Sequence, residues 1–278
     1  MKKYILYFIS VMLFVSCEKY SEVDLVLPFK NKLVSVSFIE EGTNVFQLAL
    51  TRTTPVTGSA YLNEPNYIGD AVVTLETPGR SYVLNYDTAT KFYEATMPSE
   101  FFEEGKTYQV SIAQGGETIQ GSTRIPGLVT PFASVVFDSI FEGGTYTYFA
   151  KISCGIQNPG THYISVGALM VYSDSSVVPM IPASVLTKPV SVLKNGEQTT
   201  QTFISAFSSE FVPPVRIDVL ITVCDEAYAL YNNSLNGIDL GSSGIPFGEP
   251  YIMYGNMSNK IGTIGAYRYL PLYSVPLK

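Results

Sequence analysis

Short runs of alternating apolar and polar residues, separated by turns containing Gly or Pro, dominate the chain from residue 34 onward. In the first run, Val34, Val36 and Phe38 alternate with Ser35 and Ser37. Because successive side chains of a strand point to opposite faces, this run predicts a half-buried β-strand. Six further runs cover about 46–50, 71–75, 82–86, 92–97, 107–112 and 117–125. We therefore expect an all-β protein, as 20 Tyr and 16 Phe also favour.

Two turns indicate how these strands pair. Thr77-Pro78-Gly79-Arg80 has Pro and Gly where a type II turn needs them, and Gln114-Gly115-Gly116-Glu117 is typical of a two-residue hairpin. Seven short strands with such turns predict an immunoglobulin-like β-sandwich over residues 28–126. Tyr108, at the start of the sixth strand, is expected at the position of a corner tyrosine.

The remaining residues, 127–278, are expected to form a second antiparallel β-domain with one short helix. The boundary is placed at Ile125-Pro126-Gly127, and hairpin turns are predicted at Gly143-Gly144 and at Lys194-Asn195-Gly196-Glu197. Residues 215–223 are β-branched and predict a buried strand. The helix is expected over 225–235, with Asp225 as its N-cap and Asn236-Gly237 as its end.

The N-terminus resembles a bacterial lipoprotein signal. Lys2 and Lys3 precede an apolar stretch over 4–15, and Ser16 precedes Cys17. We expect residues 1–16 to be a signal peptide and 17–27 a tether that starts at a lipidated Cys17. Plain secretion and an anchor helix are the alternatives, although a spanning helix needs about 20 apolar residues.

Charge and cysteine content narrow the classes of partner. The chain has 17 basic and 24 acidic residues, and removal of Lys2 and Lys3 leaves 15 against 24, a net charge of −9. Such a surface repels phosphates, so we expect no nucleic-acid partner. Cys154 and Cys224 could form a disulfide in an oxidising compartment. Their positions on opposite strand faces favour two unpaired thiols instead.

Two segments supply candidate contacts to a ligand or partner. The connection over 54–70 is longer than most loops, and its candidate side chains are Tyr61, Asn63, Glu64, Asn66 and Tyr67. The alternative is a crossover between sheets whose tyrosines cover the edge of the sandwich. The second segment contributes Glu249, Tyr251 and Tyr254. Its alternative is a strand entry with the two tyrosines stacked in a sheet.

The sequence offers little to catalysis. It has no Gly-x-Ser-x-Gly elbow, phosphate loop or dinucleotide fingerprint. Its single histidine, His162, could act as a general base, but a histidine beside a turn is more often a surface or hydrogen-bonded structural residue. A zinc site would have to use His162, Cys154 and Cys224. We expect no enzymatic activity, no cofactor and no metal.

Four motifs are informative together: Leu50-Thr51-Arg52-Thr53, the segment Glu103–Tyr108, the segment Asn158–Ile164 and the segment Phe247–Asn256. They resemble stretches of a Bacteroidetes outer-membrane lipoprotein family known as domain of unknown function 4249. The resemblance implies a lipoprotein often encoded beside a TonB-dependent receptor, with an accessory role in nutrient uptake and no established catalytic residues. We expect a lipid-anchored outer-membrane binding protein that is exposed at the cell surface. A structural or adhesive surface lipoprotein is the alternative, and a hydrolase is less favoured.

Overall fold

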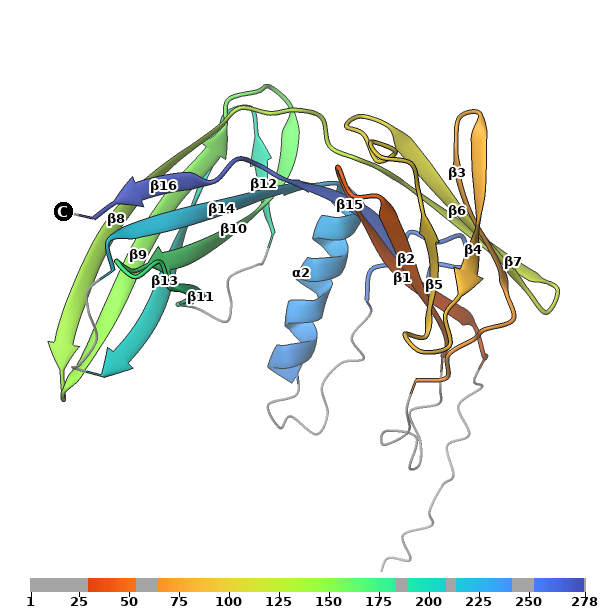
Figure 1. Cartoon of the computed structure of the whole chain (residues 1–278), viewed down its shortest axis with the longest axis horizontal. Helices are drawn as coiled ribbons and strands as arrows, with labels where there is room; N and C mark the ends of the chain where they lie inside the picture. Colours follow the sequence, from red (N-terminus) through yellow and green to blue (C-terminus); the bar gives the residue numbers. More distant parts are fainter. Residues whose placement is uncertain (1–29, 54–64, 184–189, 209–213, 242–252, 278) are drawn as a thin grey trace, which may run out of the picture. The chain divides into compact units, whose positions relative to one another are not determined.

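The computed structural model describes residues 30–53, 65–183, 190–208, 214–241 and 253–277, and side chains within these ranges other than 206–208 and 236–241. Strands predominate and the all-β prediction is confirmed, with one helix, α2, in this part of the chain (Figure 1). No helix in these ranges is both long enough and apolar enough to span a bilayer.

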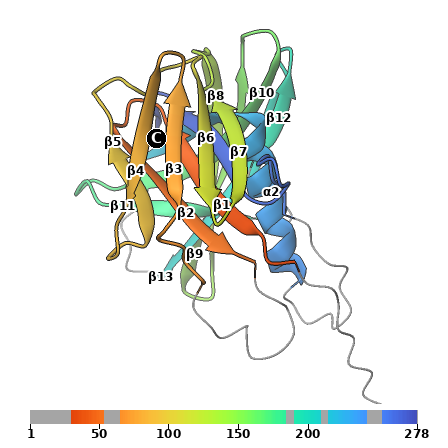
Figure 2. The same ribbon diagram turned by 90° about the vertical axis from the view of Figure 1, so that its right-hand side faces the viewer.

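The first seven strands form two layers. One layer contains β1, β2 and β5, and the other contains β4, β3, β6 and β7, which lie side by side in Figure 2. Their bounds are Leu33–Glu40 (β1), Val45–Arg52 (β2), Val72–Thr77 (β3), Arg80–Tyr86 (β4), Phe92–Thr96 (β5), Thr107–Gln114 (β6) and Glu117–Arg124 (β7). A core that includes Phe46, Val73 and Ile112 fills the space between the layers. This is the two-sheet arrangement of an immunoglobulin-like sandwich.

Turn chemistry and the corner tyrosine are both confirmed. Gly79 has φ of +82° between the paired residues Thr77 and Arg80, a conformation that glycine adopts without strain. The Tyr108 hydroxyl donates to the carbonyl of Phe101 (2.6 Å) and accepts from the backbone N–H of Glu103 (3.0 Å). The fully buried tyrosine thus fastens the loop before β6 to the strand itself.

A second two-layer arrangement follows, with its own core. Its strands are Pro131–Glu142 (β8), Thr145–Ile156 (β9), Thr161–Val171 (β10), Val177–Pro182 (β11), Ser191–Lys194 (β12), Gln198–Ser208 (β13), Arg216–Cys224 (β14) and Tyr273–Pro276 (β16). β8, β9 and β13 form one layer, while β10 pairs with β14, β11 and β12, and β14 pairs with β16. Ile152, Met170 and Ile217 are among the residues buried between them. The boundary predicted at Pro126 lies in the connection between β7 and β8.

The two cysteines are confirmed as free thiols on opposite strand faces. Cys154 is part of the second core, whereas Cys224 lies in a small separate cluster with Val190 and Ala229. Each is at most 3 % exposed. Burial raises the pKa of the Cys154 thiol to about 12.

Two local predictions need correction. The turn at Asn195-Gly196 forms, but it does not close a hairpin, because β12 pairs with β10 and β13 pairs with β9. Helix α2 spans Glu226–Gly241, so it passes through Asn236-Gly237. A glycine inside a helix costs only about 1 kcal/mol, and here this local stop signal does not end the helix. The start was right: Asp225 Oδ1 accepts the N–H of Tyr228 (2.8 Å), as an N-cap does.

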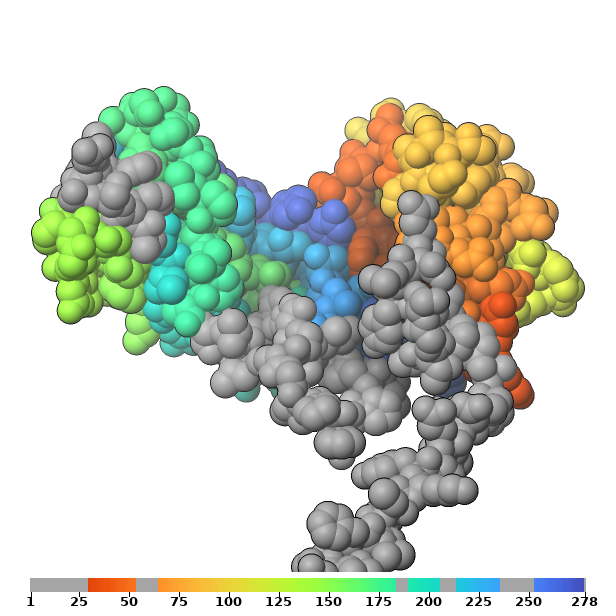
Figure 3. Space-filling view, turned by 90° about the horizontal axis from the view of Figure 1, so that it is seen from below, coloured from red at the N-terminus to blue at the C-terminus, as the bar shows by residue number. Residues whose placement is uncertain are grey.

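A strand from the end of the chain joins the first sandwich. β15, Thr263–Tyr269, pairs in parallel with β1 over Val36–Glu40 and antiparallel with the end of β14. α2 packs on β15 where Gly265 has no side chain; a Cβ there would lie 2.9 Å from Cβ of Tyr228. In the space-filling view, α2 and neighbouring blue segments lie between the orange strands of the first sandwich and the green strands of the second (Figure 3).

The face of β1 that meets the core is the one with serines. Ser35 and Ser37 are 1 % and 4 % exposed and share this face with buried Leu33 and Ile39. The Ser37 hydroxyl donates to the carbonyl of Gln47 (2.8 Å), which satisfies it. Val34, Val36 and Phe38 therefore form the outer, half-buried face of the strand.

Candidate functional site

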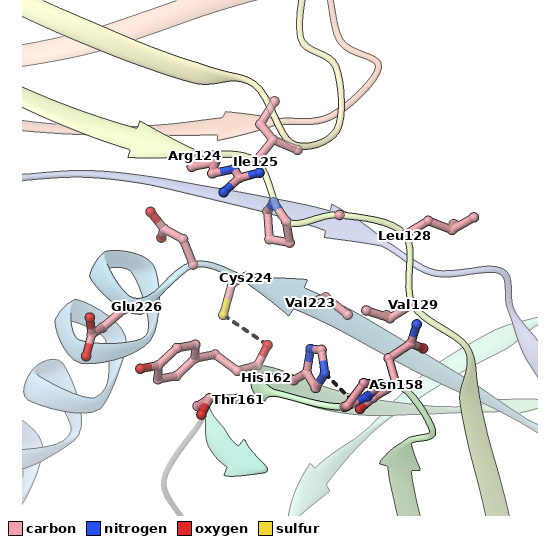
Figure 4. A pocket seen from close by; sticks show the side chains of 15 residues that line it. Arg124, Ile125, Leu128, Val129, Asn158, Thr161, His162, Val223, Cys224 and Glu226 are labelled. Atoms are coloured by element: carbon pink, nitrogen blue, oxygen red, sulfur yellow. Dashed lines mark hydrogen bonds between the residues drawn. The ribbon is translucent and has the colours of Figure 1, made fainter. Parts of the chain in front are cut away.

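A pocket of about 710 Å³ lies where the two sandwiches are joined. Three stretches line it: residues 124–129 between β7 and β8, the turn and strand start at 158–163, and the β14–α2 junction at 223–226 (Figure 4). Its volume is in the range typical of small-molecule sites. The pocket is also lined by His162, the residue that the hydrolase hypothesis would need as its general base.

His162 is held by the backbone of its own turn. Its Nε2 lies 3.1 Å from the carbonyl oxygen of Asn158. Because a carbonyl only accepts, Nε2 is the donor in this hydrogen bond. The turn is fixed in addition by the Asn158 side chain, whose Oδ1 accepts the N–H of Thr130 (2.6 Å). These contacts are those of a hydrogen-bonded turn histidine.

Cys224 lines the pocket as a thiol. Its Sγ donates to the carbonyl oxygen of Tyr163 at 3.6 Å (Figure 4). Burial, with a smaller contribution from the negative charge of Asp225, raises the pKa of the Cys224 thiol far above neutrality. A thiol is a poor nucleophile and metal ligand compared with a thiolate. Cys224 therefore contributes packing and a weak hydrogen bond to this wall of the pocket.

Asp225 connects four elements at the back of the pocket. Its carboxylate accepts from the Thr123 hydroxyl on β7, from the N–H of Tyr228 in α2 (2.8 Å) and from the N–H of Ala266 on β15 (3.2 Å). Burial raises the pKa of this carboxyl, and the hydrogen bonds partly offset that rise. The sequence predicted Asp225 only as a helix cap. Because it directly follows β14 of the second sandwich and bonds to β7 of the first, it also links the two sandwiches.

Glu226 lines the pocket and lies beside two tyrosines. Burial raises the pKa of Tyr163, and a hydrogen bond to Glu226 raises it further. Burial also raises the pKa of Tyr254, as does the negative charge of Glu226. Tyr254, a predicted contact residue, is thus half-buried in an acidic setting near the pocket. Glu226 and Tyr163 were not among the predicted site residues, because no local motif distinguishes them.

The pocket offers charged, polar and apolar side chains to a bound molecule. The pocket combines the exposed Arg124, the His162 ring and two carboxylates with apolar residues such as Leu128. Its lining residues include no serine, and its cysteine is protonated. Within the described ranges, no group of three or more His, Cys, Asp or Glu residues is arranged to hold a metal ion.

The loop residues proposed as contacts are only partly described. Tyr61, Asn63 and Glu64 lie outside the described residues, as do Cys17, Glu249 and Tyr251. Asn66 and Tyr67 are exposed and lie along β2: the N–H of Arg52 donates to the carbonyl of Asn66 (3.3 Å), and Tyr67 forms a bridge with Thr51. The end of this loop is therefore tied to the first sandwich, and the tyrosine side chain is 38 % exposed.

Asn256, the last residue of the Phe247–Asn256 motif, has a structural role. Its side chain donates to the carbonyls of Ile264 (2.8 Å) and Ser122 (3.2 Å) and accepts the N–H of Ile264 (2.9 Å). It therefore fixes the segment before β15 to β7. A lone Asn after Gly255 gave no signal of this role in the sequence.

Comparison with known proteins identifies the family. No protein of curated function matches the chain. A family model described as a domain of unknown function, DUF4249, matches residues 20–270. That range includes the first sandwich, the second sandwich except β16, α2 and the pocket between the sandwiches. The chain belongs to the DUF4249 family.

Proposed function

We propose that this protein is a lipid-anchored outer-membrane binding protein that works beside a TonB-dependent receptor in nutrient uptake. The observation that carries the proposal is the signal-like N-terminus ending at Cys17, followed by a β-sandwich body that begins at Leu33. A diacylated or triacylated cysteine anchors a protein durably, since each buried methylene contributes about 0.8 kcal/mol. The sixteen residues from Cys17 to Lys32 reach at most about 55 Å when extended.

The body suits a binding role. The junction pocket has donors, acceptors and apolar surface, and its histidine is engaged by a backbone carbonyl. The net charge of −9 of the processed chain disfavours nucleic acid as a partner. Position at the cell surface, with the tether joining the body to the outer leaflet, is part of the proposal.

The anchor is tested with Cys17→Ser in the native cell. Wild-type protein should stay in the membrane fraction, and mass spectrometry should find acyl chains on Cys17. The serine variant should move to the soluble or secreted fraction while its folded body is unchanged by circular dichroism. Cys154→Ser serves as the matched control, because that cysteine is buried and should leave fractionation unchanged. An unlipidated wild-type Cys17 would overturn the anchor.

The partnership is tested by extraction of a C-terminally tagged copy in mild detergent. A large β-barrel receptor should be recovered in near-stoichiometric amount with wild type and much less with Cys17→Ser. Repeated recovery of the lipoprotein alone would contradict the partnership. Protease treatment of intact cells tests surface exposure separately: cleavage supports it, and full resistance places the body inside.

A structural or adhesive lipoprotein is the second candidate, favoured by one observation. Strand β8 ends the strand order and carries exposed Val136, Ile140 and Phe141, each more than half exposed. Exposed apolar edges promote association between chains. Concentration-dependent assembly of the purified protein, without a co-purifying receptor, would favour this candidate.

A further inference from the structure

A second hollow, of about 560 Å³, lies on the outer face of the first sandwich. Its lining residues lie on β1, β2, β5 and β15 and in the β1–β2 turn. Of these strands, β15 lies beside α2 in Figure 1. We call it the aromatic groove. Its residues used below are the aromatic Phe38, Phe92 and Tyr267 and the polar Glu40, Asn44 and Gln47.

Strand register explains how these residues come together. Paired residues of neighbouring strands share a face of the sheet. Gln47 on β2 is opposite Glu94 on β5, and Glu40 on β1 is opposite Tyr267 on β15. Alternate positions along four strands thus place aromatic rings beside amide and carboxylate groups on one outward face.

Two of the rings are held in place by other aromatic residues. The Phe38 ring lies 5.0 Å from Tyr228 and 5.5 Å from Tyr231 of α2, centroid to centroid. The Tyr267 ring lies 5.2 Å from Tyr228, and its hydroxyl donates to Glu40 Oε2 at 2.9 Å. These contacts fix the rings before any ligand arrives, which lowers the entropy lost on binding.

The chemistry of the groove selects among ligands. Its lining residues include Glu40 but no Lys or Arg, and Glu94 lies beside it, bonded to Gln47 (3.2 Å). Anionic ligands are therefore repelled. The exposed Gln47 and Asn44 present amide donors and acceptors to solvent. Aromatic faces carry negative charge density and attract the C–H groups on the apolar face of a sugar ring.

We infer that the aromatic groove binds an uncharged oligosaccharide. Sugar rings stack on Phe38 and Phe92, and hydroxyl groups bond to Gln47, Asn44 and Glu40. The inference names a ligand class for the proposed binding function and rests on it for its biological role. The binding itself needs neither the lipid nor a receptor, so its failure leaves the Cys17 and co-purification results untouched.

Isothermal titration calorimetry of the purified protein with neutral hexasaccharides tests the inference. The probes are maltohexaose, cellohexaose, xylohexaose, mannohexaose and laminarihexaose. At least one should bind, and Phe92→Ala and Gln47→Ala should each weaken that binding tenfold or more. Phe141→Ala is the matched control, because it removes an exposed ring from the other sandwich and should leave affinity unchanged.

Two variants make the result decisive: Gln47→Ala, which does not depend on Phe92→Ala folding, and Glu40→Gln, which separates neutral from cationic ligands. Gln47 is exposed, so Gln47→Ala stays informative if Phe92→Ala fails to fold. Glu40→Gln should change affinity for a neutral sugar less than about threefold, whereas a cationic ligand would lose tenfold or more. Absence of binding to every neutral probe, equal loss with Phe141→Ala, or binding only of spermidine and glucosamine oligomers would overturn the inference.

Discussion

The strands β7 and β8 lie at the two ends of the strand order and differ in whether another segment covers their outer edge. β7 is covered by a later segment: the N–H of Gln120 donates to the Ser258 hydroxyl (3.0 Å), and the N–H of Ser258 donates to the carbonyl of Gln120 (2.7 Å). Met257, 2 % exposed, packs where Gly121 has no side chain. We refer to residues 253–263 as the covering segment.

β8 pairs with β9 along all 12 of its residues, and no other strand in the described part of the chain pairs with its other side. Val136 and Ile140 on it are 66 % and 53 % exposed. The N–H of Ser139 is bonded locally, to Asp138 Oδ1 at 2.7 Å. Because an open edge is a template for pairing with another chain, β8 is the edge available to a partner, and β7 is already used within the fold.

The largest expected loss of stability comes from a glycine of the covering segment, and a glycine of the β8–β9 turn is its comparison. Gly262, in the covering segment, has φ of +86°, and a Cβ there would lie 2.2 Å from the carbonyl oxygen of Ser35. Gly143, in the β8–β9 turn, has φ of +59° and nothing within 4 Å of such a Cβ. We expect Gly262→Ala to lower the free energy of unfolding by about 4 kcal/mol. Gly143→Ala should cost about 1 kcal/mol. Urea unfolding followed by circular dichroism measures both, and equal losses would contradict a tightly packed cover.

Asn256→Ala should have the next largest effect. The change removes three hydrogen bonds of the covering segment, two to Ile264 and one to Ser122. At about 1 kcal/mol each, the free energy of unfolding should fall by about 2 to 3 kcal/mol. Hydrogen exchange of the Ile264 amide should accelerate. Asn66→Ala, at an exposed amide, is the control and should change stability by less than about 0.5 kcal/mol. Unchanged protection of Ile264 would show that Asn256 does not hold the cover.

The difference between the edges also shows which features the sequence could predict. The strands of the first sandwich, the turns at Gly79 and Gly143-Gly144 and the cap at Asp225 follow from local residue preferences, and all are confirmed. The cover on β7 depends on contacts between residues more than 130 positions apart, such as Gln120 with Ser258. No local pattern specifies such a pairing.

Contacts between distant residues also explain why the sequence did not indicate which face of β1 meets the core or which residues form the candidate site. Hydropathy marks Val34, Val36 and Phe38 as the apolar set, yet α2 packs on Phe38 from outside and the serine face meets the core. The residues of the aromatic groove come from distant segments, as do Glu226 and Tyr163, so none of them appeared among the predicted site residues. Of the predicted contact residues that the structure describes, Tyr254 lies near the pocket between the sandwiches, through its proximity to Glu226.

A smaller effect is expected from pH, through the link between β7 and α2. Burial raises the pKa of Asp225, so the folded state takes up a proton more readily than the unfolded chain does. Stability from this group therefore rises as pH falls through the window between the unfolded and folded pKa values. Asp225→Asn removes that gain, so the advantage of wild type over the variant should grow between pH 7 and pH 4. Urea midpoints across this range measure it.

Asp174 provides a control of opposite sign for that experiment. Two hydrogen bonds from Ser176 lower the pKa of this exposed carboxyl, the larger effect coming from the Ser176 side chain and the smaller from its backbone N–H. Its stabilising contribution is present above the unfolded pKa and is lost as pH falls through the folded value. The advantage of wild type over Asp174→Asn should thus shrink on acidification. A change in the same direction for both variants would contradict the assignment for Asp225.

The smallest effect on stability, and the sharpest test of the open edge, is expected from Ile140→Lys on β8. Because Ile140 is more than half exposed, its replacement should change the free energy of unfolding by less than about 0.5 kcal/mol. A lysine on an edge strand disfavours pairing with a second strand, so any concentration-dependent association should weaken. Thr118→Lys, at an exposed position of the covered strand β7, should leave association unchanged. Sedimentation velocity over a range of concentrations compares the two. If Thr118→Lys weakened association as much as Ile140→Lys, the effect would come from net charge, and β8 would not be the edge that pairs.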